Sequence, residues 1–287
     1  MLLVQQLVNG LMMGAQYAMI ALGFALVFSV LRVLNLAHPE IFVVGAYLGL
    51  LASQYLIDNI IIALVVAMVG SALVGVMVQR FFLRPLKNPL ELTPFVITIG
   101  IAIFIKHTLV YFFSARSISF PSLIGPVYYK LGELEFYSIH LITSLIAVVL
   151  LIAMKAFVNH TFMGRAIRAT AEHPDVASCM GVNVDFVNLL TFSISSALGG
   201  AGGVLIGTMF GAINPFMGEG YGLKALVCMI VGGLGSLGGT IVAGFILGLA
   251  ESLGVHLISA SYRDAFAFGI LMIVLLVRPY GIMGKKE

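Results

Sequence analysis

Charge is scarce in this sequence. Lysine, arginine, aspartate and glutamate together make up 9% of its 287 residues, whereas 61% are apolar and the mean hydropathy is +1.11. Soluble domains have about 25% charged and roughly 45–50% apolar residues. The composition therefore excludes a soluble globular protein and indicates an integral membrane protein.

Cysteine and recognisable catalytic motifs are scarce too. Cys179 lies in a polar segment and Cys228 in an apolar run, which predicts neither a disulfide nor a metal site. HExxH, GxSxG and Walker A motifs are absent. A GxGxxG match at Gly233, Gly235 and Gly238 lacks the strand and βαβ context of a dinucleotide site. We therefore expect no cofactor and no enzymatic activity, and any ATP must bind to another chain.

Long uncharged runs fill most of the chain, and most are near or above the roughly 20 residues that a helix needs to cross a bilayer. The alternation of a membrane β-barrel is absent, and helices otherwise satisfy the backbone in lipid. The start lacks a basic leader and a cleavage site, so we expect a membrane segment there rather than a signal peptide. The expected spans are residues 5–31, 40–57, 60–79, 93–113, 136–157, 186–210 and 262–280.

Residues 223–256 form a further apolar segment, which the run Gly232–Gly239 interrupts. If both limbs crossed the membrane, the basic C-terminus would face outward, so we expect a re-entrant hairpin entered from outside. The sequence thus predicts an all-α, polytopic membrane protein with about eight membrane segments in a single domain, residues 1–287.

The distribution of basic residues predicts the orientation. In residues 114–135 basic and acidic residues balance, whereas three other parts of the chain have an excess of basic residues. The positive-inside rule places residues 80–91, 158–185 and the C-terminus in the cytoplasm, and 114–135 outside. The basic residues that decide this are Arg80, Arg84, Lys87, Arg165, Arg168, Arg278, Lys285 and Lys286.

Small residues recur at helical spacing in three segments, and such ridges let helices in lipid approach closely. We expect them to pack helices of the same chain; a seam between two subunits is the alternative. The ridges are Gly45, Gly49 and Ser53, then Gly199, Gly203, Gly207 and Gly211, and finally Thr240, Gly244, Gly248 and Ser252.

A polar segment, residues 164–181 (GRAIRATAEHPDVASCMG), separates two apolar runs. Six of the 27 charged residues, 15 basic and 12 acidic in all, lie between Lys155 and Asp185, and none lies between Phe186 and Gly218. A membrane protein that concentrates its few charges in one loop is expected to have a partner there. A merely solvated loop is the alternative.

The polar segment has the pattern of a helix, a break, a second helix and a stop. Pro174 starts a second turn, Gly181 can end it in the left-handed conformation, and Asn183 or Asp185 can cap the next span. Residues 164–172 favour a first helix that places on nearly one face the charges of Arg165, Arg168 and Glu172.

A second polar stretch, Arg32–Glu40 (RVLNLAHPE), joins the first two spans, and by this orientation it lies on the cytoplasmic side. Its structural interpretation is a helix start: Pro39 suits the first turn, His38 or Asn35 can cap it, and Glu40 complements the positive helix end. The functional alternative is a polar gate formed by Asn35, His38 and Glu40, because ionisable groups near membrane depth are costly and usually functional.

Three other ionisable residues interrupt apolar runs near their outer ends. Lys106 lies a turn or two from the end of the fourth span, and Glu251 and His256 lie near the end of the hairpin. We expect all three to be solvated at the membrane interface.

Six motifs spread over nearly the whole chain are specific together, though each is weak alone. They are Leu31–His38 (LRVLNLAH), Arg84–Lys87 (RPLK), Thr98–Gly100 (TIG), Gly164–Arg168 (GRAIR), Gly232–Gly239 (GGLGSLGG) and Arg278–Gly281 (RPYG). With them the chain resembles the permease subunits of branched-chain amino acid ABC importers, in the LivH branch. The family usually has glycine after the histidine of the first motif, where this chain has Pro39.

The resemblance implies a bacterial inner-membrane importer. A periplasmic binding protein would deliver the substrate, two permease subunits would form the pathway, and two cytoplasmic ATPases would drive it. The second permease is expected to be a paralogue, and no nucleic-acid partner is expected. The substrate would be leucine, isoleucine, valine or a related small amino acid, with urea or amides as the alternative within the family.

The resemblance also implies roles for particular residues. Residues 158–185 match the family's coupling loop, so contact with the ATPase is expected from Gly164, Arg165, Arg168, Glu172, Ala177 and Gly181. Polar backbone at helix breaks could meet the charged ends of an amino acid. The candidates for the translocation pathway or gate are Tyr17, Asn35, His38, Glu40, Gly232, Gly233, Gly235 and Ser236.

Two other classes of protein remain as alternatives. An ion-coupled secondary transporter would need buried carboxylates in mid-span, and the sequence places Glu40 and Glu251 near span ends. An intramembrane enzyme is disfavoured by the missing motifs.

Overall fold

The chain folds into a bundle of helices, and the all-α, polytopic prediction is confirmed. The computed structural model describes residues 2–86, 92–125, 127–131 and 134–284. Among these, six helices are long and apolar enough to cross a membrane. They are α1 (Leu2–Leu31), α3 (Ile60–Met77, continued by the π-helix Val78–Leu83), α4 (Thr93–Phe113), α5 (Ser138–His160), α8 (Val184–Phe210) and α10 (Leu237–Leu257).

Three shorter helices complete the bundle. They are α2 (His38–Tyr55), α9 (Met217–Gly232) and α11 (Arg263–Val277), the last preceded by the 3-10 turn Ala260–Tyr262. The predicted break of the apolar hairpin is confirmed, because α9 ends at Gly232 and α10 begins at Leu237. The span predicted at residues 93–113 is α4 itself, and the other predicted spans differ from the helices by a few residues at one end or both.

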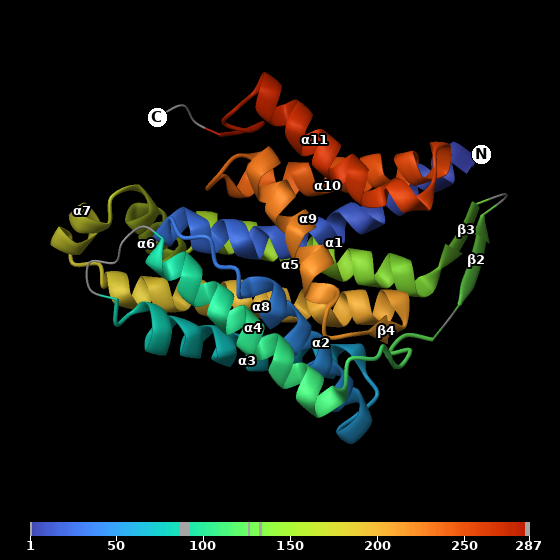
Figure 1. The fold of residues 1–287 in the computed structure, drawn as a ribbon, viewed down its shortest axis with the longest axis horizontal. Helices are drawn as coiled ribbons and strands as arrows, with labels where there is room; N and C mark the ends of the chain where they lie inside the picture. Colours follow the sequence, from blue (N-terminus) through green and yellow to red (C-terminus); the bar gives the residue numbers. More distant parts are fainter. Residues whose placement is uncertain (1, 87–91, 126, 132–133, 285–287) are drawn as a thin grey trace.

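The bundle has two distinct ends (Figure 1). At the left lie the short helices α6 (Phe162–Glu172) and α7 (Pro174–Cys179), and this end is termed the α6–α7 end. At the right, the start of α1 lies near the antiparallel hairpin of β2 (Tyr128–Leu131) and β3 (Leu134–Tyr137), which defines the β2–β3 end.

A second small ribbon follows α4 and α8. Strand β1 (Ile118–Ser119) pairs antiparallel with β4 (Ala212–Ile213), so that Ile118 lies opposite Ile213. The segment between α4 and α5 is thereby fixed to the turn after α8.

Helices α1 and α8 form the core. In their most apolar stretches 83% and 72% of the residues are buried, against 28% in α3 and 17% in α4. Gly203 of α8 lies against the Phe42 carbonyl of α2, and Gly248 of α10 lies against Gly10 and Gly14 of α1, so that a side chain at either would overlap a neighbouring backbone. These ridges therefore pack helices of the same chain, as expected.

The polar segment folds as its residues predict. Thr161 caps α6, because its Oγ1 accepts a hydrogen bond from the Gly164 N–H at 2.9 Å. Gly181 follows α7 with a φ of +84°, and Asn183 Oδ1 accepts from the Phe186 N–H at 3.0 Å to cap α8. Both cysteines are free, as expected: Cys179 is exposed and Cys228 is buried.

Candidate functional site

Helix α2 begins inside the bundle rather than at its end. Arg32, with a φ of +54°, turns the chain back after α1, and a Cβ on Gly23 would stand 2.6 Å from Cε1 of His38. Gly23 lies eight residues before the end of α1, about 12 Å deep at a rise of about 1.5 Å per residue. The prediction that all of Arg32–Glu40 lies at the cytoplasmic side does not fit this depth. Arg32 shares a cavity with Glu172, whereas His38 lies within the bundle because Gly23 leaves room for its imidazole.

Helix α9 also begins inside the bundle, and its first turn meets that of α2. A Cβ on Gly218 would lie 2.9 Å from the carbonyl oxygen of Pro39, so the two backbones are in contact. From this contact α2 runs alongside α8 toward the β2–β3 end (Figure 1). Helix α9 runs toward the α6–α7 end, where Gly235 shares a cavity with Glu172. Two positive helix ends therefore face each other within the bundle.

Lys106 of α4 connects these two first turns. Its Nζ forms an ion pair with Glu219 of α9 and lies 3.9 Å from Oε1 of Glu40 of α2. The side chains of Glu40 and Lys106 are 4% and 17% exposed, whereas that of Glu219 is 58% exposed. The interfacial position predicted for Lys106 is therefore wrong. Pro39, Glu40, Lys106, Gly218 and Glu219 are termed the helix junction.

His38 and Asn35 shape the turn that brings Glu40 inward. Ser195 Oγ donates to the Gly23 carbonyl at 2.7 Å and lies 3.3 Å from His38 Nδ1. Asn35 Oδ1 accepts from the Ala37 N–H at 3.2 Å. Both side chains are buried, and neither caps α2. The capping role considered for them is replaced by contacts with α1 and α8 and by a local turn.

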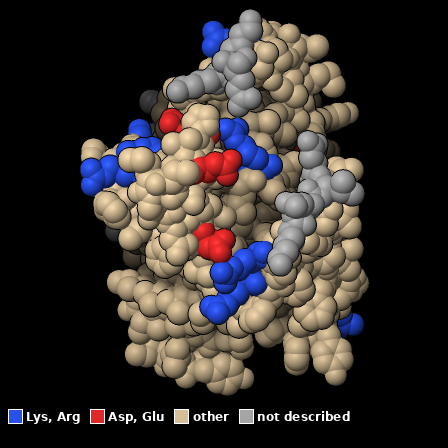
Figure 2. Space-filling view, turned by 90° about the vertical axis from the view of Figure 1, so that its left-hand side faces the viewer, with Lys and Arg blue, Asp and Glu red and all other residues tan. Residues whose placement is uncertain are grey.

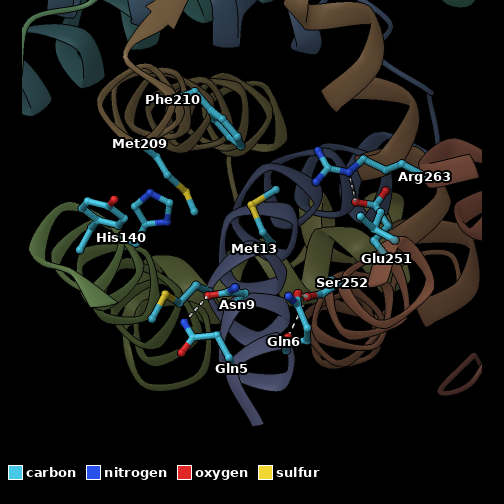
Figure 3. A pocket seen from close by; sticks show the side chains of 14 residues that line it. Gln5, Gln6, Asn9, Met13, His140, Met209, Phe210, Glu251, Ser252 and Arg263 are labelled. Carbon is cyan, nitrogen blue, oxygen red and sulfur yellow. Dashed lines mark hydrogen bonds and ion pairs between the residues drawn. The ribbon is translucent and has the colours of Figure 1, made fainter. Parts of the chain in front are cut away.

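A second cluster joins four helices around Glu251 of α10, which is buried. Tyr17 Oη of α1 donates to Glu251 Oε2 at 2.6 Å. Lys224 Nζ of α9 lies 2.6 Å from Glu251 Oε1 and 3.1 Å from Asp264 Oδ1. Arg263 Nε, at the start of α11, is 3.9 Å from Glu251 Oε2 (Figure 3). These five residues are termed the Glu251 cluster.

The interfacial solvation predicted for Glu251 is wrong, because its side chain is 3% exposed. His256, farther along α10, is exposed as predicted. The sequence analysis did not single out Lys224, although a signal exists: Lys224 and Glu251 are lone, opposite charges that bracket the uncharged run 225–250. A hairpin brings such charges together.

The first half of α9 connects the two charged sites. The ring of Tyr221 packs between the rings of Tyr17 and Phe42, at centroid distances of 6.4 and 5.6 Å. On the same helix, Glu219 belongs to the helix junction and Lys224 belongs to the Glu251 cluster. Of the pathway candidates, Glu40 belongs to the helix junction, and Asn35 and His38 shape the turn just before it. Tyr17 belongs to the Glu251 cluster.

The other four pathway candidates lie apart, where they contact the C-terminal tail. The N–H groups of Ile282 and Met283 donate to the carbonyls of Val231 and Gly232, at 2.8 and 3.0 Å. Gly233 has a φ of +107°, and a Cβ on it would stand 2.5 Å from the Gly284 nitrogen. Gly235 also has a positive φ, and Ser236 caps α10. Residues 232–236 therefore form a turn at the α6–α7 end, and residues 281–284 of the C-terminal tail pack against it.

Neighbouring glycines of this turn provide a matched test. A Cβ on Gly239 would stand 3.0 Å from Met283 Cβ and would overlap the Gly232 carbonyl, whereas the nearest atom to one on Gly238 is 4.0 Å away. We expect Gly239→Val to lower the stability of the purified protein by about 1–3 kcal/mol, through overpacking, and to expose the tail to proteases. Thermal unfolding and limited proteolysis measure this. Equal behaviour of Gly238→Val and Gly239→Val contradicts the described packing.

The α6–α7 end carries the charged face of the molecule. Figure 2 shows basic and acidic side chains gathered on this face. Arg165, Arg168 and Glu172 are exposed on α6, and Arg168 also donates to the Val158 carbonyl at the end of α5. Of the other three residues predicted to contact an ATPase, Gly164 and Ala177 are buried and Gly181 supplies the turn after α7. Arg165, Arg168 and Glu172 are therefore accessible on this face, whereas Gly164, Ala177 and Gly181 shape the helices and the turn.

No group of three or more potential metal ligands occurs in the part of the chain that the structure describes.

Comparisons with known proteins agree over the full length. Residues 6–275 match the family model described as branched-chain amino acid transport system / permease component. The chain is 35% identical to the high-affinity branched-chain amino acid transport system permease protein LivH of Escherichia coli (strain K12), over 99% of this chain and 96% of that protein. With the same coverage it is 32% identical to the permease protein BraD of Pseudomonas aeruginosa.

One solved structure shares the fold. PsaBC from Streptococcus pneumoniae, in complex with Fab, aligns with a TM-score of 0.52 at 14% identity, over 95% of this chain and 91% of that chain. At this identity the likeness concerns the fold alone.

Proposed function

This chain belongs to the family of branched-chain amino acid transport permease components, and from that membership we propose that it is the permease subunit of an ATP-driven importer for leucine, isoleucine, valine or a related small amino acid. The observation that carries the proposal is the helix junction. Inside an apolar bundle it presents two helix starts, two carboxylates and a lysine. Broken helices of this kind offer polar groups to the charged ends of substrates in membrane transporters.

The pathway runs past the helix junction and the Glu251 cluster. Tyr17 and Glu40 line this pathway. Asn35 and His38 shape the turn that directs Glu40 toward it. The turn with Gly232, Gly233, Gly235 and Ser236 closes it at the α6–α7 end, where it packs on the C-terminal tail.

The α6–α7 end faces the cytoplasm and the β2–β3 end faces outward. Basic residues concentrate at the cytoplasmic side of membrane proteins. At the α6–α7 end, Arg165 and Arg168 lie on α6, and Arg32 lines a cavity with Arg168. Arg84, one turn after Arg80, forms an ion pair with Asp185 at the start of α8, and Arg278 precedes the tail that packs on Gly232. A substrate-binding protein then docks at the β2–β3 end, and an ATPase subunit docks on residues 158–185.

The exposed face of α4 contacts the second permease subunit, which is a paralogue. Helices α3 and α4 are both poorly buried, but their faces differ in chemistry. Helix α3 presents an aliphatic stripe that includes Val65, Val69 and Leu73, which suits lipid. Helix α4 presents His107 beside partly exposed Lys106, and ionisable groups facing lipid are costly.

Site-directed photo-crosslinking distinguishes these two faces. A photoreactive residue in place of Phe104 of α4, which is 72% exposed, is expected to crosslink to the second permease in the assembled complex. The same residue in place of Val69 of α3, 56% exposed, is expected to crosslink to lipid only. Crosslinking to the permease from Val69 and not from Phe104 assigns the interface to α3 instead.

The substrate class is tested with the purified complex and its binding protein. We expect leucine, isoleucine and valine to stabilise the binding protein against heat, because a ligand that binds only the folded state stabilises it, and to stimulate the ATPase of the reconstituted complex. Urea and acetamide serve as controls and are expected to do neither. Stimulation by urea but not by leucine overturns the substrate assignment.

A further inference from the structure

A cavity of about 280 Å³ opens beside the Glu251 cluster. Its volume is just below the range of drug-sized ligand pockets, about 300–1,000 Å³, which suits a small ligand. Aromatic rings and two cations line it: Tyr17, Phe216, Tyr221, Lys224 and Arg263.

The charges of the Glu251 cluster balance. Lys224 and Arg263 line the cavity, and each lies within 4 Å of a carboxylate of Glu251 or Asp264. Lys224 and Glu251 are 11% and 3% exposed, whereas Arg263 and Asp264 are 45% and 76% exposed. A ligand with one positive and one negative end can replace these contacts without leaving the charge of Lys224 or Glu251 unpaired, and a ligand with a single charge cannot.

The cluster is reached from the β2–β3 end. Arg263 is 45% exposed, and it lines both this cavity and a second one of about 310 Å³ that contains Gln5, Asn9 and Glu251 (Figure 3). The cluster therefore stands between an opening lined by amides near the start of α1 and the helix junction deeper in the bundle.

We propose that the Glu251 cluster binds the charged ends of a zwitterionic α-amino acid with an apolar side chain. Arg263 and Lys224 take the carboxylate, Glu251 and Asp264 take the ammonium group, and the side chain lies against Phe216 and Tyr221. The inference rests on the proposed function, since it locates the substrate of that same importer. It makes Arg263 and Lys224 substrate-binding residues in addition to their ion pairs.

Direct binding to the permease–ATPase complex in lipid nanodiscs, without the binding protein, tests this site. Radiolabelled leucine is the probe, and leucinamide, which lacks the carboxylate, is the competitor. We expect Arg263→Gln to weaken leucine binding about 10- to 100-fold, the range for losing a charge-assisted contact. It should also remove the preference for leucine over leucinamide, and Arg263→Lys should restore part of both. Because Arg263 Nε is 3.9 Å from Glu251 Oε2 and the Arg263 side chain is 45% exposed, Arg263→Gln should change the melting temperature little.

A second variant tests the cavity without touching a charge. Gly220 lines the cavity, and a Cβ on it would meet no atom within 4 Å. Gly220→Leu is therefore expected to fold normally, to fill part of the cavity and to weaken leucine binding at least about tenfold. The control is Gly269→Leu on α11, where a Cβ also meets nothing within 4 Å and binding should not change.

Two outcomes separate this site from the proposed function. If the wild-type complex binds and imports leucine while Arg263→Gln and Gly220→Leu bind it equally well, the cluster only clamps α9, α10 and α11, and the site is overturned. If the wild-type complex neither binds nor imports leucine or any related amino acid, the proposed function itself fails.

Discussion

Replacing both Arg165 and Arg168 with glutamate is expected to lower substrate-stimulated ATPase activity about 10- to 100-fold. The two side chains lie on one exposed face of α6, which leads through α5 and α8 into the bundle. Reversing charges that meet a complementary surface costs several kcal/mol at interfaces, and coupling requires that nucleotide binding favour one arrangement of the helices. The measurement is ATP hydrolysis by the reconstituted complex with and without substrate-loaded binding protein.

Two variants separate docking from folding in this experiment. Arg168 also donates to the Val158 carbonyl of α5. Arg165→Glu alone is therefore the cleaner probe, because the Arg165 guanidinium lies 5.7 Å from the ring centroid of Phe162 on the same helix. Arg80→Glu is the matched control, since Arg80 is exposed on the π-helix that continues α3, outside residues 158–185. Unchanged stimulation in the double variant, or an equal loss in Arg80→Glu, contradicts the role proposed for α6.

Replacing Lys106 with methionine is expected to destabilise the protein by about 3–5 kcal/mol, the usual cost of removing one partner of a buried ion pair. The variant leaves the carboxyl group of Glu40, which is 4% exposed, without its cation. We expect a large drop in melting temperature and loss of leucine uptake. Adding Glu40→Gln should recover most of the stability, because it removes the unpaired charge.

The other carboxylate on the same lysine provides the control. Glu219 is 58% exposed, and exposed ion pairs contribute about 0–1 kcal/mol, so Glu219→Gln should change the melting temperature little. If Glu219→Gln and Lys106→Met destabilise equally, the buried pair is not what stabilises the junction. If the double variant Glu40→Gln, Lys106→Met regains stability and full transport, these charges have no role in the pathway.

Local features were predictable because short-range interactions fix them. The break at Pro174, the stop at Gly181 and the cap at Asn183 each depend on neighbours within a few residues, and all three occur as predicted. The apolar spans were predictable for a similar reason, since hydropathy and length alone define them.

The depth of the polar groups was not predictable. Arg32–Glu40 has the composition of an end loop, and only the space left by Gly23, many residues earlier and facing inward, lets His38 enter the bundle. Likewise the partners of Lys106 and Glu251 come from other helices. A sequence pattern indicates which face of a helix is buried. How deep a charge lies in the membrane depends on which helices begin within the bundle rather than at its end.

The buried carboxylates bear on the choice between transporter classes. An ion-coupled transporter needs carboxylates that exchange ions within the membrane, and the structure does bury Glu40 and Glu251. Each lies within 4 Å of a lysine, so each charge is already matched by a protein cation. Because both carboxylates are paired with lysines and α6 carries an exposed charged face, an importer driven by a separate ATPase is favoured over an ion-coupled transporter.

Uptake of radiolabelled leucine by proteoliposomes that contain the permease pair and its ATPases tests the central claim most directly. With substrate-loaded binding protein outside and ATP enclosed, we predict leucine accumulation against its gradient. We also predict that a non-hydrolysable ATP analogue abolishes accumulation and that dissipating the proton and sodium gradients leaves it unchanged. Accumulation without ATP, driven by an ion gradient, would contradict the assignment as the permease of an ATP-driven importer.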